Sequence, residues 1–130
     1  MLIQTDLDEA PDFIRLTLDG VWPSIEEQRQ LRRSLVAKGL LTAETCALID
    51  LRMVATVPRY EEVQLIAEAA LEEGGLPMYR AYVVGSALQY GVVRQLQSAA
   101  GASVTRIGVF SDQTEALVWL MREKRGGAQG

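Results

Sequence analysis

Apolar and polar residues alternate with a period of two near the start of the chain. From residue 12 to residue 19 the apolar positions include Ile14, Leu16 and Leu18, and polar residues separate them. A period of two indicates a half-buried β-strand. Residues 46–51 and 81–84 are almost continuously apolar, which is typical of central strands covered on both faces. The pattern therefore predicts strands at 12–19, 46–51, 81–84 and 105–110, with a short strand at 1–5 before them.

Apolar residues recur every three or four positions between these strands, as on the buried face of an amphipathic helix. The clearest run is Val63, Ile66, Ala67, Ala70 and Leu71. The same spacing predicts that Val36, Leu88 and Met121 face the core on the other three helices. Three helix starts show the capping-box pattern, in which two side chains three positions apart satisfy each other's backbone N–H groups. These pairs are Ser24 with Glu27, Ser86 with Gln89, and Asp112 with Glu115.

The predicted elements follow the order strand, strand, helix, strand, helix, strand, helix, strand, helix. Such alternation implies an α/β fold with a mixed, mostly parallel sheet of four or five strands and about four helices. The strand-to-helix loops of such a sheet meet at its carboxyl edge, where ligands usually bind. We expect a single domain over residues 1–122 and a flexible C-terminal tail over 123–130, because Gly126 and Gly127 disfavour a helix.

Composition narrows the chemistry. The 130 residues include no histidine and one cysteine, and 13 basic against 17 acidic residues give a net charge of −4. Without histidine there is no imidazole base for a serine or cysteine nucleophile and no histidine-ligated zinc. One thiol makes neither an internal disulfide nor a cysteine-only metal site. The acidic balance argues against binding to nucleic acid.

The first residues carry neither the positive charge nor the long apolar run of a signal peptide. No uncharged apolar stretch approaches the roughly 18 residues that span a bilayer. We therefore expect a cytoplasmic protein with no transmembrane segment.

Five segments resemble the SpoIIAA-like, STAS-type family in their order and spacing. They are Phe13–Gly20, Leu48–Arg52, Arg80–Ser86, Val109–Asp112 and Glu115–Leu120. The resemblance covers residues 2–122 and lies in order and spacing, not in a catalytic signature. It implies a small STAS-like α/β domain with a mixed sheet whose first strand lies at an edge. It also implies likeness to bacterial anti-sigma-factor antagonists and to lipid-carrying CRAL-TRIO domains.

The sequence departs from this family at one functional position. Anti-sigma-factor antagonists carry a phosphorylatable serine in the turn that opens the helix after the central strand. The corresponding stretch here is Val57-Pro58-Arg59-Tyr60, with Thr56 as a poor substitute. Phosphorylation acts by adding charge at a helix start or an interface. A phospho-switched exchange of partners is therefore not carried over to this chain.

Polar candidate residues lie at the ends of two predicted central strands. Asp50 and Arg52 form either a charged pair that faces a ligand or a carboxylate cap with an arginine paired to it. Gly85 and Ser86 open a helix, whose free N–H groups and dipole favour an anion. The alternative at Ser86 is plain N-capping with Gln89 as its partner. No glycine-rich nucleotide motif accompanies this helix start.

Aromatic candidate residues gather at the predicted strand-to-helix loops. Trp22, Tyr60 and Tyr90 would line an apolar pocket at the carboxyl edge; alternatively, they seal the core or form a dimer patch. Ser111 follows the last strand. Gly91 lies in the middle of a helix, where glycine costs about 1 kcal/mol against alanine. We therefore expect a neighbouring helix or a ligand to pack close to Gly91.

Basic and acidic residues separate onto different predicted helices. The first helix carries four basic residues, and the second carries five glutamates. A basic face suits an anionic partner or a lipid headgroup, although a solvated face is the commoner case. The two helices would also make complementary contacts in a dimer. The basic residues are Arg29, Arg32, Arg33 and Lys38.

These features predict a non-enzymatic regulatory or protein-interaction module that acts with a protein partner or as a homodimer. The alternative is a carrier or sensor of a small apolar or amphipathic, lipid-like anion at the carboxyl edge. No catalytic residue, metal or cofactor is predicted. An enzymatic function would rest on Asp50, Arg52, Tyr90 or Ser111, and their spacing does not support it. The candidate ligand-binding residues are Trp22, Asp50, Arg52, Tyr60, Gly85, Ser86, Tyr90 and Ser111.

Overall fold

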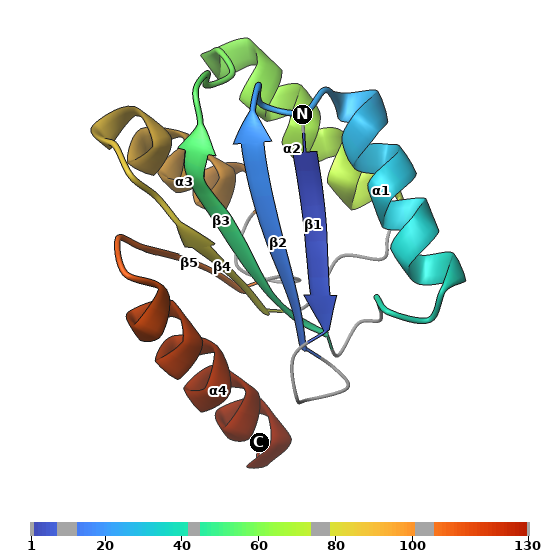
Figure 1. The fold of residues 1–130 in the computed structure, drawn as a ribbon, viewed down its shortest axis with the longest axis vertical. Coiled ribbons are helices and arrows are strands. Elements are labelled where there is room, and N and C mark those ends of the chain that lie inside the picture. Colours follow the sequence, from blue (N-terminus) through green and yellow to red (C-terminus); the bar gives the residue numbers. More distant parts are fainter. Residues whose placement is uncertain (1, 8–12, 42–44, 74–78, 101–105, 130) are drawn as a thin grey trace.

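The structure, a computed structural model, describes residues 2–7, 13–41, 45–73, 79–100 and 106–129. Strands and helices alternate after an initial pair of strands (Figure 1). The predicted α/β class is confirmed, and each predicted strand is present. The elements are β1 (Leu2–Leu7), β2 (Phe13–Gly20), α1 (Ile25–Ala37), β3 (Cys46–Val54), α2 (Tyr60–Glu73), β4 (Tyr79–Val83), α3 (Ala87–Ala100), β5 (Arg106–Phe110) and α4 (Gln113–Gln129).

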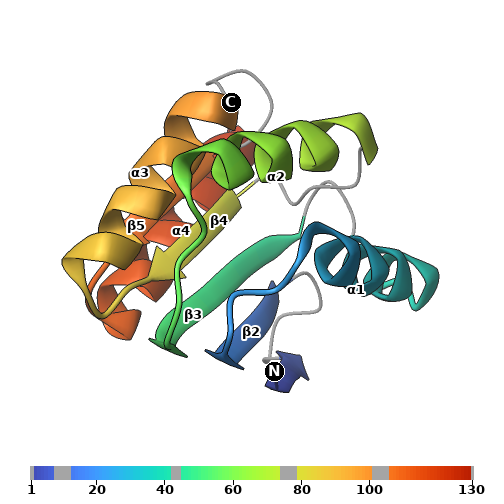
Figure 2. The same ribbon diagram turned by 90° about the horizontal axis from the view of Figure 1, so that it is seen from above.

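The five strands form one sheet in the order β1-β2-β3-β4-β5. β1 pairs antiparallel with β2, and every other neighbouring pair is parallel. The sheet is therefore mixed, with its first strand at an edge, as the resemblance implied. Right-handed crossovers that advance in one direction place α1, α2 and α3 on one side of the sheet. α4 packs on the other side, against β3, β4 and β5 (Figure 2).

Two apolar clusters pack on the two faces of the sheet. Ala47, Ile49 and Leu51 of β3 belong to the cluster under α1–α3, and Cys46 and Leu48 belong to the cluster under α4. β3 is thus covered on both faces, which explains its nearly continuous apolar sequence. Burial also raises the pKa of the Cys46 thiol, so the thiol stays protonated and unreactive.

Helix α1 begins and ends as its sequence predicts. Ser24 Oγ accepts from Glu27 N, and Glu27 Oε1 accepts from Ser24 N, both at 3.1 Å. At the other end, Gly39 has a φ of +74°, and its N–H donates to Val36 O at 3.0 Å. The Leu40 N–H donates to Leu35 O at 2.9 Å, which completes a Schellman motif. Local sequence therefore fixes both ends of this helix.

Three apolar side chains predicted to face the core are exposed instead. Val36 is exposed because Leu31 and Leu35 set the inner face of α1, and the next residue turns about 100° away. Met121 of α4 is exposed for the same reason, since Ala116 and Leu120 take the buried positions. Leu88 is 71% exposed, because the buried side of α3 includes the neighbouring Gln89 and is therefore turned away from Leu88.

Helix α4 is longer than the sequence analysis predicted. It continues through Gln129, into the range 123–130 that the sequence predicts to be a flexible tail. Glycine raises the cost of a helix by about 1 kcal/mol at Gly126 and Gly127 but does not forbid it. At the start of this range Glu123 Oε2 accepts from Arg106 Nη1 of β5 at 2.6 Å, which links α4 to the sheet.

Gly91 was expected to have a neighbouring helix or a ligand packed close to it, and the prediction of a neighbouring helix is wrong. Outside its own helix, nothing lies within 4 Å of the position that a Cβ would take. Gly91→Ala should therefore raise the free energy of unfolding by about 0.5–1 kcal/mol, because alanine loses less backbone entropy in a helix. Urea denaturation measures the change. Gly39→Ala is the control and should destabilise, since φ is +74° there. A loss of stability in Gly91→Ala would contradict the open surroundings.

Candidate functional site

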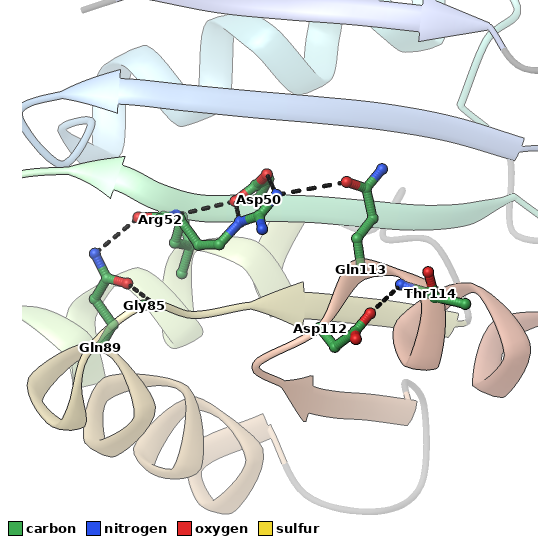
Figure 3. A network of polar contacts seen from close by, with 8 residues as sticks. Asp50, Arg52, Gly85, Gln89, Asp112, Gln113 and Thr114 are labelled. Atoms are coloured by element: carbon green, nitrogen blue, oxygen red, sulfur yellow. Dashed lines mark hydrogen bonds and ion pairs between the residues drawn. The ribbon is translucent and has the colours of Figure 1, made fainter.

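The eight candidate residues all lie near the carboxyl edge of the sheet, but on two sides of it. The parallel strands β2, β3, β4 and β5 end at this edge. Asp50 and Arg52 of β3 lie on the side of α4, next to Gln113 (Figure 3). Trp22 packs against the cluster on the opposite side. The structure therefore does not gather the eight residues into one site.

Asp50 and Arg52 form a close charged pair. Arg52 Nη2 donates to Asp50 Oδ2 at 2.7 Å, and Arg52 Nε donates to Asp50 Oδ1 at 3.0 Å, so the guanidinium grips both carboxylate oxygens. The Arg52 backbone N–H also donates to Asp50 Oδ1 at 3.0 Å. The Asp50 side chain is 11% exposed, and that of Arg52 is 43% exposed. The pair thus has a buried acidic end and a solvent-facing basic end.

The pKa of Asp50 reflects two opposed effects. Burial alone raises the pKa of this carboxyl, because a charge is less stable away from water. The hydrogen bonds and charge of Arg52, with the charge of Arg15, outweigh burial and lower the pKa overall. The pKa of Arg52 is raised in turn, first by its hydrogen bond to Asp50. Asp50 is therefore an anion at neutral pH and is not tuned to transfer a proton near pH 7.

Gln113 at the start of α4 lies between two guanidinium groups. In one orientation of its amide, the carbonyl oxygen accepts from Arg52 Nη2 at 3.5 Å. In the other orientation, the carbonyl oxygen accepts from Nη1 and Nη2 of Arg15, both at 3.2 Å. The second orientation makes the shorter contacts, and it links β2 to α4 beside the Asp50–Arg52 pair. Asp112 adds a further negative charge near Arg52.

A β-bulge in β3 explains why a carboxylate and an amide are buried here. β2 and β3 pair Thr17 with Asp50 and then Asp19 with Met53, so β3 has one extra residue between these pairs. A bulge disrupts the ladder and leaves backbone groups without strand partners. Asp50 Oδ1 accepts from the Arg52 N–H inside the bulge. The polar side chains at this edge thus serve the backbone of the bulged strand.

Gln89 of α3 satisfies the carbonyl groups of the same segment. Its side chain is buried, and Nε2 donates to Leu51 O at 2.7 Å and to Val54 O at 2.9 Å. Oε1 accepts from Gly85 N at 2.8 Å (Figure 3). Gln89 therefore joins the end of β3 to the turn between β4 and α3.

Gly85 and Ser86 are occupied by contacts within the chain. Ser86 Oγ accepts from Gln89 N at 3.1 Å, which is the first half of the predicted capping box. The second half differs, because Gln89 reaches the N–H of Gly85 rather than that of Ser86. A Cβ on Gly85 would lie 3.4 Å from Arg52 Cγ, so the turn packs closely on β3. These contacts support the capping alternative for Ser86.

The other candidates differ in exposure. Trp22 is half-buried, and its backbone N–H donates to Thr56 Oγ1 at 3.0 Å. This placement fits the alternative that Trp22 seals the core. Tyr60 and Tyr90 are exposed, and Ser111 is exposed at the start of the turn into α4. Asp112 caps that helix through Oδ1, which accepts from Thr114 N at 2.6 Å. The predicted capping box requires the donor to be Glu115 N, so the observed donor lies one residue earlier in the chain.

Three residues of this edge were missed as site residues in the sequence. Arg15 was assigned to the polar face of a strand, Gln89 to a cap, and Gln113 to no role. Gln89 reaches Leu51 O and Val54 O over 38 and 35 residues of sequence, and Gln113 reaches Arg52 over 61. The one local signal was Gln89, a polar residue placed between apolar residues at helical spacing.

Two searches of the described residues give negative results. In these ranges no group of three or more histidine, cysteine, aspartate or glutamate residues is arranged to hold a metal ion. No helix in the described part of the chain is long and apolar enough to cross a membrane.

The topology and the edge geometry define an α/β domain with a SpoIIAA-like fold. A crystal structure with this fold, an uncharacterised protein of the DUF3478 family from Shewanella loihica PV-4, is similar to this chain with a TM-score of 0.63. The two sequences are 20% identical, and the match covers 92% of each chain. No family model matches the sequence, and no curated protein does. The resemblance found in the sequence is thus confirmed for the fold.

Proposed function

We propose that this chain is a non-enzymatic regulatory or protein-interaction module of the SpoIIAA-like type. It acts in the cytoplasm and binds its partner at the carboxyl edge of the sheet. The observation that carries this proposal is a set of large apolar side chains exposed at that edge. We call the set the apolar edge; its members are Val21, Met53, Tyr60, Leu88 and Tyr90.

Several contacts show that the segments of the apolar edge are neighbours. The loop after β2 is tied to the loop after β3 by the bond from Trp22 N to Thr56 Oγ1. α3 is tied to the start of α2 by Gln95 Nε2, which donates to Tyr60 O at 2.8 Å. Gln89 ties α3 to the end of β3. Single exposed apolar residues are ordinary, but a cluster of them marks an interaction site.

The polar groups of this edge support binding rather than catalysis. A general base works best when its pKa lies near the working pH, and the pKa of Asp50 is lowered instead. Both carboxylate oxygens are engaged by Arg52. The Thr56 hydroxyl, the nearest residue type to a phosphorylatable serine in this stretch, accepts from the Trp22 N–H. The proposed module therefore exchanges partners without a phosphorylated serine at this position.

The apolar edge should be necessary for partner binding. The double variant Met53→Ser, Leu88→Ser should recover at least roughly tenfold less partner from cell lysate than the wild type, since buried apolar anchors carry most binding energy. Quantitative mass spectrometry after affinity capture measures the recovery. The matched control is Val118→Ser, Met121→Ser on α4, which removes two exposed apolar side chains from the other side of the sheet.

The same experiment separates the alternative function. If partner recovery is equal in the edge variant and the control, the interaction proposal is wrong. Native mass spectrometry of the wild type then tests the carrier alternative, in which a small amphipathic anion binds at this edge. A ligand adduct that the edge variant loses would support the carrier. A bare mass in both proteins would leave neither function supported by this edge.

A further inference from the structure

Arg80 of β4 has no acidic partner in the part of the chain that the structure describes. Its Nη1 donates to Tyr82 Oη, two residues further along the strand, at 3.2 Å. The guanidinium carbon lies 6.0 Å from the centre of the Tyr82 ring, which adds a cation–π contact. The Arg80 Nε–H is buried and has no hydrogen-bond partner. Arg80 is therefore held by one aromatic side chain and keeps a buried donor unpaired.

The unpaired edge of this guanidinium is the edge that binds carboxylates in a two-pronged fork. Arg52 shows the same edge in use, because its Nε and Nη2 donate to the two oxygens of Asp50 at 3.0 and 2.7 Å. On Arg80, Nε has no partner, and Nη2 makes no hydrogen bond to a described residue and is not fully buried. The chain thus supplies an oxyanion to the fork of Arg52 but none to the fork of Arg80.

The Tyr82 hydroxyl adds another donor beside Arg80. Tyr82 is 7% exposed, and its oxygen accepts from Arg80 Nη1. A phenolic hydroxyl also has a proton to donate, and a buried tyrosine hydroxyl usually has a hydrogen-bond partner. No acceptor for this proton is present among the described residues. Nε and Nη2 of Arg80 and the hydroxyl of Tyr82 are therefore three neighbouring donor groups that lack an acceptor.

The pairing of β4 places these donors in apolar surroundings. Arg80 pairs with Ala47 of β3 and with Ile107 of β5. Ala47, Tyr82 and Ile107 all belong to the apolar cluster under α1–α3, so Arg80 lies on this face of the sheet. Arg80 is the second residue of β4, which puts it near the amino edge, opposite the apolar edge. Away from bulk water, a hydrogen bond between an arginine and an anion is stronger.

The end of α3 accounts for the positive charge of Arg80 but not for its unpaired fork. α3 follows a parallel strand and runs back to the amino edge, and its last turn has no basic residue. Gln97 near this end donates Nε2 to the carbonyl oxygen of Ile107, the residue that pairs with Arg80. The last carbonyl groups of a helix carry partial negative charge, which favours a cation nearby. This field stabilises the guanidinium, yet within the described residues it pairs neither Nε nor Nη2.

We propose that Arg80 and Tyr82 bind an oxyanion, the carboxylate or phosphate group of a small molecule, at the amino edge of the sheet. Nε and Nη2 of Arg80 donate to two oxygens of the anion, and the Tyr82 hydroxyl donates to one of them. Nη2 is the accessible end of the fork, so the anion enters from that side. The negative end of α3 opposes the anion, so an anion without further contacts should bind with a dissociation constant on the order of millimolar. This site does not rest on the proposed function, which concerns the carboxyl edge.

Two titrations of the full chain test the proposal, one with inorganic phosphate and one with acetate, at constant ionic strength. NMR spectroscopy follows the Nε–H signals of the arginines. The Arg80 signal should shift and saturate with at least one anion, because an oxyanion becomes the partner of this donor. Saturation with phosphate alone identifies a phosphate site, saturation with acetate alone identifies a carboxylate site, and saturation with both identifies a site for either group. Each of these three results supports the proposal.

Substitutions separate the fork of Arg80 from its charge. Arg80→Lys keeps the charge but removes the fork, and it should raise the dissociation constant at least roughly tenfold. Tyr82→Phe keeps the ring but removes the hydroxyl, and it should raise the constant roughly threefold. An unchanged constant in Tyr82→Phe would remove the hydroxyl from the site.

The matched control is Arg94→Lys, because Arg94 is an exposed arginine of α3. This variant should bind the anions like the wild type, and the Arg94 signal of the wild type should not saturate. An Arg80 signal that shifts no more than that of Arg94 with both anions at about 50 mM, well above the expected constant, would overturn the proposal. Binding by Arg80→Lys that equals that of the wild type would overturn it as well. The wild-type titration decides even where a variant does not fold.

Discussion

Replacing Gln89 by alanine is expected to lower the free energy of unfolding by about 3 kcal/mol. The side chain is 4% exposed and makes three hydrogen bonds, to Leu51 O, Val54 O and Gly85 N. Each bond contributes about 1 kcal/mol, and a buried group left without a partner costs about 1–3 kcal/mol. Water that enters beside the freed carbonyl groups would partly replace the lost hydrogen bonds. The expected loss in free energy of unfolding is therefore smaller than the sum of the largest penalties for the three unpaired groups.

The matched control lies two turns further along the same helix. Gln95 Nε2 also donates to a backbone carbonyl, that of Tyr60, at 2.8 Å, but this bond is exposed. Gln95→Ala should cost less than about 1 kcal/mol, because water replaces the lost partner. Urea denaturation of both variants with the wild type measures the difference. Equal losses in the two variants would show that Gln89 does not hold the bulged end of β3.

A second substitution separates the hydrogen bonds of Gln89 from its volume. Gln89→Glu keeps the size of the side chain but replaces the amide donor by a carboxylate oxygen next to two carbonyl oxygens. This variant should be at least as unstable as Gln89→Ala at pH 7, because it adds an unpaired buried charge. If Gln89→Glu were as stable as the wild type, the donor role of Nε2 would be wrong.

The α/β fold could be predicted because its signals are local. Strand periodicity, the Ser24–Glu27 capping box and the glycine after α1 each act within a few residues, and each is present in the structure. The order of the elements then left few ways to wind a parallel sheet. The sheet order β1-β2-β3-β4-β5 is the simplest of these.

The polar network at the carboxyl edge could not be predicted in the same way. The bulge in β3 depends on how β3 pairs with β2, and Gln113 meets Arg52 across 61 residues of sequence. β3 is almost continuously apolar, so its sequence has no period of two that an extra residue would interrupt. The Asp50–Arg52 pair was predicted correctly, because its members lie two residues apart on one strand.

Gln89 also explains why one face of α3 was misjudged. The sequence predicts this glutamine to be the capping-box partner of Ser86 and places Leu88 and Val92 on the buried stripe. In the structure the stripe includes Gln89, Val93 and Leu96, so Leu88 lies at its margin. A buried amide with three partners is not distinguishable by residue type from an exposed amide. The exposed Leu88 that results is part of the apolar edge.

Asp50→Asn is expected to lower the free energy of unfolding by about 2 kcal/mol at pH 7. The asparagine keeps the shape of the side chain but loses the charge that pairs with Arg52. Hydrogen bonds to charged groups contribute about 1.5–3 kcal/mol, and a middle value is expected because Arg52 is 43% exposed and can turn to solvent. The variant also leaves Arg15 and Arg52 as near positive charges without the carboxylate between them.

The control for this variant is a more exposed ion pair at a similar distance. Arg106 Nη1 and Glu123 Oε2 are 2.6 Å apart, but the Arg106 side chain is 63% exposed. Glu123→Gln should cost at most about 1 kcal/mol, because exposed pairs contribute little. Urea denaturation at pH 7 compares the two variants. A larger loss in Glu123→Gln than in Asp50→Asn would contradict the importance given to burial.

The pH dependence gives an independent test of the same carboxylate. The pKa of Asp50 is lowered in the folded protein, and that of an unfolded aspartate is about 3.9. The folded state therefore binds the proton less readily, so the contribution of Asp50 is fully present above about pH 5. It is lost as the pH falls below about 4 and through the folded pKa.

The difference in stability between the wild type and Asp50→Asn should accordingly be constant from pH 7 to pH 5 and shrink toward pH 3. Comparing the two proteins at each pH cancels the titration of the other carboxylates. A difference that grows on acidification would mean that burial, rather than Arg52, dominates the pKa of Asp50.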